Sequence, residues 1–136
     1  MRSPNVLLPL AEWRDPRHRL GLAGEVAAAR FLEAAGFVIE AHRFRMGHHD
    51  LDLVARQGTL VAFVEVKSRR TTAFGHPAAS IGWRRRRDLA RLATLWMMRH
   101  GRAGDRYRFD VVTVQWEGPG FPHVSHITDA WRVVEK

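Results

Sequence analysis

Two apolar runs in the middle of the chain contain charges that buried strands rarely hold. The runs are Leu51–Ala55 and Val61–Lys67, and the charged residues inside them are Asp52, Glu65 and Lys67. A charge inside a buried strand is costly unless it is paired or bound to a metal ion. Three such charges on neighbouring strands therefore predict a metal-dependent site.

The two runs are expected to form a hairpin around Gln57-Gly58. A two-residue turn there places Asp52 opposite Phe63 and diagonal to Glu65, roughly 7–8 Å away at the backbone. Alternation along the strands then gives one apolar face, made of Leu51, Leu53, Ala55, Leu60, Ala62, Val64 and Val66. The other face carries Asp50, Asp52, Val54, Val61, Phe63, Glu65 and Lys67. A slip of one residue would scatter the charges, so the pattern supports this register.

Periodicity and turn residues predict the remaining elements. Helices are expected at 21–35 and 80–100, strands at 37–45, 50–56, 59–67 and 107–116, and a short fifth strand at 123–127. Residues 1–20 read as an N-terminal arm, and residues 21–136 as a single domain. The order α-β-β-β-α-β predicts an α/β or α+β fold around a mixed sheet.

The net charge of +8 makes nucleic acid a reasonable partner, and all but two of the 22 basic residues are arginine. A solvated, arginine-rich surface is the alternative explanation. The chain has no cysteine, which excludes disulfides and thiolate metal sites and fits a reducing, cytoplasmic location. It has no apolar run of the roughly 20 residues that a membrane helix needs, so no membrane partner is expected.

The acids suggest which ion the site would hold. Asp52 and Glu65 offer hard oxygen ligands, which suit Mg²⁺ or Mn²⁺ better than zinc. Lys67 shares their face and could orient water or contact a phosphate. The alternative is a cross-strand salt bridge between Glu65 and Lys67 without function.

Glu25 is a candidate third acid. It falls within the apolar arc of the first helix, so it could face the charged side of the hairpin and complete the site. Alternatively, its carboxylate simply favours the positive end of the helix dipole.

Several arginines are candidates for phosphate contact: Arg43, Arg45, Arg69, Arg70, Arg84, Arg87 and Arg91. Arg84, Arg87 and Arg91 share the polar face of the second helix, which could equally be a solvated face. His48 and His49 are expected to be exposed in a turn. The tryptophans Trp83, Trp96, Trp116 and Trp131 are expected in the core or at helix caps.

Together these residues resemble a known family. The motifs that carry the resemblance are Gly24-Glu25, Asp50-Leu51-Asp52-Leu53, Phe63-Val64-Glu65-Val66-Lys67-Ser68-Arg69, Phe74-Gly75, Arg108-Phe109-Asp110-Val111-Val112 and His126-Ile127. From about Leu20 to Trp131 the chain is similar to the PD-(D/E)XK nuclease superfamily. It most closely resembles the YraN-like bacterial family, which is similar to Holliday-junction resolvases.

The resemblance implies a restriction-endonuclease-like core, with a mixed four-stranded sheet flanked by helices. It also implies metal-dependent phosphodiester hydrolysis. Asp52 and Glu65 match the metal-binding acids, and the Val66 carbonyl is the third oxygen. Lys67 matches the lysine of the motif, and Glu25 matches the helix acid.

The chain departs from the family pattern at His48-His49-Asp50, where Gly-Gly-Glu is usual, and at Arg43, where asparagine is usual. The bulky pair is expected to alter substrate entry. The first hypothesis is a Mg²⁺- or Mn²⁺-dependent endonuclease acting on DNA rather than RNA, on branched or damaged structures. The alternatives are a non-cleaving nucleic-acid-binding module and a structural partner in a repair or uptake complex. By analogy, a resolvase-like task favours a homodimer, because two symmetric cuts need two sites.

Overall fold

The computed structural model describes residues 19–70, 81–116, 120 and 122–132. Its elements, in chain order, are α1 (Arg19–Ala34), β1 (Val38–Met46), β2 (His49–Gln57), β3 (Leu60–Arg69), α2 (Trp83–His100), β4 (Arg106–Gln115) and β5 (His123–Trp131). The predicted α/β class and element order are confirmed, and the predicted short fifth strand is a full strand of nine residues. The expected arm and the Phe74-Gly75 motif lie outside the described residues.

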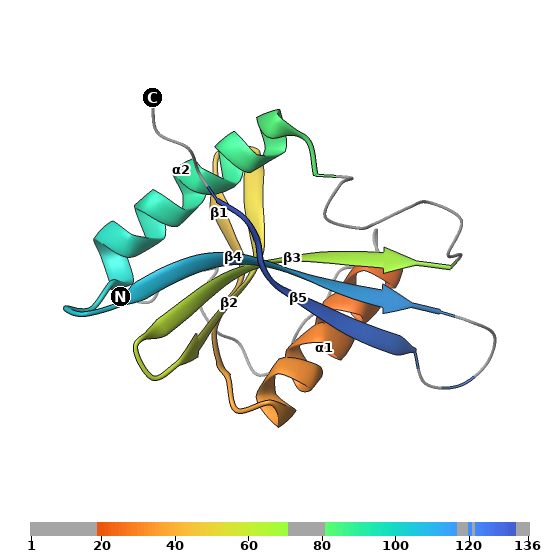
Figure 1. The fold of residues 1–136 in the computed structure, drawn as a ribbon. Helices are drawn as coiled ribbons and strands as arrows, with labels where there is room; N and C mark the ends of the chain where they lie inside the picture. The colour runs from red at the N-terminus through yellow and green to blue at the C-terminus, as the bar shows by residue number, and fades with distance from the viewer. Residues whose placement is uncertain (1–18, 71–80, 117–119, 121, 133–136) are drawn as a thin grey trace.

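The five strands form one mixed sheet in the order β1-β2-β3-β4-β5. Neighbouring strands run antiparallel except β3 and β4, which are parallel and are connected through α2. Parallel strands need such a crossover connection, and a helix commonly supplies it. Figure 1 shows α2 on one face of the sheet and α1 on the other.

Each helix buries its own apolar cluster against the sheet. The α1 cluster includes Ala28, Ala29 and Leu32 from the helix, with Leu53 and Val64 from the sheet. The α2 cluster contains Phe44, Leu51, Val54, Val61, Phe63, Leu89, Leu92, Ala93, Trp96 and Trp131, among others. Central strands covered on both faces read as nearly continuous apolar runs. Charged residues therefore stand out within them.

The predicted faces of β2 are wrong at one position. Leu51 was expected to share a face with Leu53, but it packs in the α2 cluster. His42 pairs with Leu53 and Phe44 with Leu51, but Arg43 and Asp52 between them do not pair. Arg43 has a positive φ of 53°, and this local distortion of β1 breaks the alternation at Asp52.

No described helix is both long and apolar enough to cross a membrane.

Candidate functional site: an acid pair at the end of β2 and β3

Asp52 and Glu65 lie opposite each other where the pairing of β2 and β3 ends. The last backbone pair of these strands is Leu53↔Val64, and one further step along each strand brings the two acids face to face. The Asp52 carboxylate reaches across to β3, where its Oδ2 accepts a hydrogen bond of 2.8 Å from the Val66 backbone N–H. The backbone of the two strands therefore places the two carboxyl groups close together.

The predicted diagonal relationship between these acids is wrong by two residues of register. The turn consists of Gly58 and Thr59, so that Gln57 pairs with Leu60. Gly58 adopts a positive φ of 62°, a conformation that suits glycine in a tight hairpin. A shift of two residues by itself moves no side chain to the other face of the sheet. The acids consequently lie closer together than the sequence indicated.

The two carboxyl groups do not ionise independently. Burial raises the pKa of Asp52 well above its usual range, and the negative charge of Glu65 and a hydrogen bond with it raise that pKa further. Burial also raises the pKa of Glu65, but hydrogen bonds from Asp52 and Arg85 outweigh this, so that its pKa is lowered. Two close carboxylates commonly share one proton in this way. Of the two acids, Asp52 is the one whose pKa is raised.

Arg85 is the residue that sequence reasoning missed. Its Nε donates to Glu65 Oε2 at 2.8 Å, and its terminal nitrogen donates to the Asp50 carbonyl oxygen at 2.7 Å. Helical spacing could have identified Arg85 as a residue that faces the sheet, because it precedes the buried Leu89 and Leu92 by four and seven residues. An arginine at such a position faces the sheet, and it needs a carboxylate partner there.

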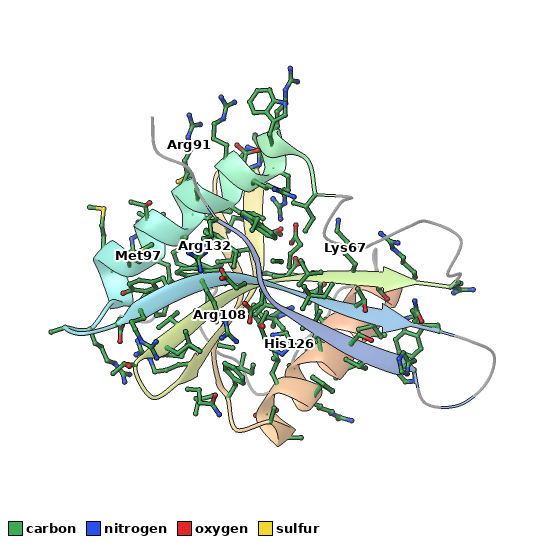
Figure 2. All side chains as sticks on the ribbon, in the orientation of Figure 1. Lys67, Arg91, Met97, Arg108, His126 and Arg132 are labelled. Atoms are coloured by element: carbon green, nitrogen blue, oxygen red, sulfur yellow. The ribbon has the colours of Figure 1, made fainter. Side chains whose placement is uncertain are left out.

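Lys67 follows Glu65 by two residues on β3, and it projects from the strand near its end (Figure 2). Its side chain is half-buried. Its positive charge helps to lower the pKa of Glu65. Within the described part of the chain, no carboxylate forms a salt bridge with Lys67. The charge of Lys67 therefore acts at Glu65, and the role predicted for Lys67 stays a prediction.

Glu25 faces the sheet, but other partners hold its carboxylate. Its Oε1 accepts hydrogen bonds from His42 Nε2 at 2.6 Å and from Arg43 Nε at 2.8 Å. Burial raises the pKa of Glu25, but the bonds from His42 and Arg43 outweigh it, and the pKa is lowered. Because α1 begins at Arg19, Glu25 lies in the second turn, where the helix dipole explains little. Its negative charge also contributes to the raised pKa of Asp52.

The donor set fits a hard divalent cation that keeps much of its water. Among the described residues, no three histidine, aspartate or glutamate side chains lie close enough to hold a metal ion. Glu25 is bonded to His42 and Arg43, and its predicted part in a metal site stays a prediction. Mg²⁺ is usually bound by one or two carboxylates together with water and phosphate oxygens. Asp52, Glu65 and the Val66 carbonyl would suffice for such an ion.

The predicted phosphate-binding arginines differ in how available they are. Arg43 is half-buried and bonded to Glu25, so its guanidinium is already engaged. Arg45 is exposed, 3.8 Å from the Asp50 carboxylate. Arg69 is half-buried, whereas Arg70 is exposed at the end of β3, and Arg84, Arg87 and Arg91 are exposed on α2. Their contact with nucleic acid stays a prediction.

The tryptophans lie in the core or at a helix end, as expected, but Trp83 at the start of α2 is not packed. Trp96 and Trp131 belong to the α2 cluster, and Trp116 Nε1 donates to Ser68 Oγ at 2.7 Å. Trp83, the first residue of α2, remains 65 % exposed. His48 and His49 are exposed as expected.

The model of the uncharacterised protein family UPF0102 matches residues 24–114, which include the acid pair, Lys67 and Arg85. The chain belongs to this family. It is 34 % identical to a UPF0102 protein of Geobacter sulfurreducens over 93 % of this chain and 98 % of that protein. A UPF0102 protein of Nocardia farcinica is 40 % identical over 93 % and 97 % of the two chains. The YraN-like membership predicted from the sequence is thus confirmed.

A UPF0102 protein of Symbiobacterium thermophilum is 44 % identical over 71 % of this chain and 82 % of its own length. The three similarities cover between 71 % and 93 % of this chain and between 82 % and 98 % of the relatives.

Proposed function

We propose that this UPF0102 protein is a Mg²⁺- or Mn²⁺-dependent endonuclease-like hydrolase that cleaves phosphodiester bonds in DNA. The observation that carries the proposal is the face-to-face placement of Asp52 and Glu65, with Lys67 beside them. Structural ion pairs join opposite charges, whereas two close acids, one of them with a raised pKa, are typical of functional sites. The resemblance to the PD-(D/E)XK nucleases supports the same reading.

Each residue of the site would have its own role in this reaction. Asp52, Glu65 and the Val66 carbonyl would hold the cation, and the Val66 N–H fixes the orientation of Asp52. When bound, the cation would lower the pKa of a water molecule and stabilise charge on the phosphate. Lys67 would orient the attacking water or neutralise the developing charge. Arg85 holds Glu65 in position through two hydrogen bonds.

The net charge of +8 supports a polyanionic substrate. Exposed arginines on α2 and at the end of β3 would contact the phosphate backbone and position it without reading sequence. The first turn of α2 borders the acid pair through Arg85, and Arg69 and Arg70 follow Glu65 by four and five residues along the chain. A strand bound by these arginines would therefore pass close to the cation.

A second candidate function is nucleic-acid binding without cleavage. One observation favours it: the guanidinium of Arg85 already neutralises Glu65 at 2.8 Å. A cation at the acid pair would have to share Glu65 with Arg85. If the ion pair prevails, the fold would serve as a binding module.

The deciding experiment measures cleavage of linear, nicked, flapped and four-way DNA with Mg²⁺, with Mn²⁺ and with EDTA. The nuclease proposal expects metal-dependent cleavage that is lost in Asp52→Ala and retained in Glu33→Gln, which changes an exposed acid on α1. DNA binding without cleavage under every metal condition would instead support the binding module.

A further inference from the structure

The first turn of α2 presents an exposed tryptophan beside two guanidinium groups. Trp83 is 65 % exposed. The Cζ atoms of Arg84 and Arg87 lie 5.5 Å and 5.2 Å from the centroid of its ring. Tryptophan normally buries most of its large ring, so such an exposed position calls for a partner. We call Trp83, Arg84 and Arg87 the indole platform.

The platform lies on the outer face of α2. The residues of this helix that pack against the sheet are Leu89, Leu92, Ala93 and Trp96. At about 100° per residue, Trp83, Arg84 and Arg87 fall on the opposite arc, which also carries Arg91. Figure 2 shows Arg91 projecting outward from α2. The ring is thus not part of the packing that holds the helix to the sheet.

The same helical turn joins the platform to the acid pair. Arg85, two residues beyond Trp83, points to the other side of the helix and contacts Glu65 at 2.8 Å. The platform and the acid pair consequently lie on opposite sides of the first turn of α2. One bound nucleic-acid strand could reach both.

The chemistry of the platform fits an unpaired base with its phosphates. An indole ring offers a flat surface on which any base can stack, and guanidinium groups bind phosphate. Within the described residues, neither Arg84 nor Arg87 forms a salt bridge with a carboxylate, so their charge is available to a ligand. Bases within a duplex are already stacked on one another. A base that can reach the ring must therefore come from a single-stranded or splayed segment.

We infer that Trp83, Arg84 and Arg87 form a stacking platform for an unpaired base, which directs the protein to single-stranded or flapped DNA rather than to intact duplex. This inference rests on the proposed function, because it takes DNA as the substrate. It adds a substrate class and a residue that do not follow from the acid pair.

The test measures binding by fluorescence anisotropy in EDTA, so that no cleavage occurs. The probes are a labelled single strand, a flapped duplex and a blunt duplex of the same sequence. Trp83→Ala is expected to weaken binding of the single strand and the flap by about 5- to 150-fold, the range for loss of one base–aromatic stack. Blunt duplex binding is expected to change less than about 2-fold, since stacking makes no contribution there.

Two variants serve as controls. Trp83→Phe retains a ring and is expected to recover most of the single-strand affinity. Met98→Ala removes another exposed apolar side chain of α2, which is 79 % exposed, and is expected to change none of the affinities. Because the ring of Trp83 is outside the core, thermal unfolding of Trp83→Ala should match that of the wild type.

Three results would overturn the inference: unchanged affinity of Trp83→Ala for all probes, an equal loss for all three probes, or no binding of any probe by the wild type. The first would indicate that the platform docks a protein. Failure of the nuclease proposal is distinguishable, because it would show as absent cleavage while the Trp83-dependent preference for single strands persists. Conversely, Asp52→Asn should abolish cleavage and leave that preference intact.

Discussion

Asp52 lies opposite Glu65 across β2 and β3, and its Oδ2 accepts the backbone N–H of Val66 at 2.8 Å. Burial and the charge of Glu65 raise the pKa of Asp52. At neutral pH the folded state therefore holds a carboxyl group that resists ionisation. An arrangement that costs folding free energy in this way is typical of a binding or catalytic site.

Replacing Asp52 with asparagine should stabilise the fold. The amide can still accept from Val66 and donate to Glu65, and it carries no charge. Because the pKa of Asp52 is raised in the folded state, its protonated form stabilises the fold at a pH below its unfolded pKa, about 3.9. This contribution to the free energy of unfolding is lost as the pH rises through the folded pKa. Asp52→Asn should therefore gain about 1–3 kcal/mol over the wild type at neutral pH, with a smaller gain near pH 4. Thermal denaturation at a series of pH values measures this, with Glu33→Gln as the exposed-acid control; a gain independent of pH would contradict it.

Divalent cations should stabilise the wild type by binding to the folded acid pair. Mass action predicts about 2.7 kcal/mol when the free cation is at 100 times its dissociation constant. In a thermal shift assay, Mn²⁺ should raise the melting temperature of the wild type, and EDTA should reverse the effect. Glu65→Gln and Asp52→Asn should lose most of the shift. A shift of equal size in these variants would place the ion elsewhere.

Lys67 should matter for chemistry more than for cation binding. Its ammonium lies beside the acid pair but supplies no ligand to a cation. Lys67→Met should therefore keep the Mn²⁺-induced thermal shift, or enlarge it, because a competing positive charge has been removed. Cleavage should fall by about 10²–10³-fold, the usual loss for one group that stabilises transition-state charge. Lys67→Arg, which keeps the charge, should lose less. Unchanged cleavage by Lys67→Met would remove this residue from the mechanism.

The pattern of β2 and β3 predicted the face of most of their residues but not their exact register. Alternation of apolar and charged residues fixes a register only to within steps of two, because every second residue returns to the same face. Whether the hairpin turn is formed by Gln57-Gly58 or by Gly58-Thr59 depends on the relative energies of the two turns. The alternation of residues carries no information about these energies. Asp52 was for this reason placed beside Glu65 on the correct face and at the wrong separation.

The hydrogen-bond partners of Glu25 and Glu65 could not be predicted from the sequence pattern for a different reason. Helical spacing correctly predicted that Glu25 faces the sheet. Its contacts with His42 and Arg43 depend on the distorted segment of β1, which the spacing does not predict. Arg85 was hidden in a run of four arginines that read as one polar feature. Long-range side-chain contacts depend on how helices dock, and composition carries little information about docking.

Gly24 lets α1 approach the end of β3, and a side chain there should destabilise the protein. A Cβ atom at Gly24 would lie 2.7 Å from both Cβ and Oγ of Ser68. Ser68 cannot easily withdraw, because its Oγ accepts a hydrogen bond from Trp116 Nε1 at 2.7 Å. Overpacking of this kind costs about 1–3 kcal/mol, which exceeds the roughly 1 kcal/mol that alanine gains over glycine in a helix. Urea denaturation of Gly24→Ala should show a net loss.

A double-mutant cycle with Ser68→Gly, which removes the clashing atoms, should show that the two losses do not add. Strict additivity would mean that the helix and strand are not in contact at this point.

Asp110 should be the acid whose loss most damages the fold. It is fully buried, and its carboxylate accepts from Arg108 Nε at 2.9 Å, from His126 Nε2 at 2.8 Å and from the Asp129 backbone N–H at 2.9 Å. Burial raises its pKa, but these bonds outweigh it and the pKa is lowered. The stability that the ionised Asp110 contributes is therefore present at a pH above its unfolded pKa, about 3.9. It is lost as the pH falls through the folded pKa.

Asp110→Asn leaves Arg108 and His126 without a carboxylate, and should cost about 3 kcal/mol at neutral pH. The cost should shrink in acid, where the wild type loses the same interaction. Asp129→Asn is the matched control: the backbone N–H to Asp110 is retained, its positive φ of 51° suits asparagine, and only an exposed pair with Arg132 is removed. Chemical denaturation at neutral and acidic pH tests both variants. Equal stability of the two at neutral pH would show that the buried carboxylate does not hold β4 to β5.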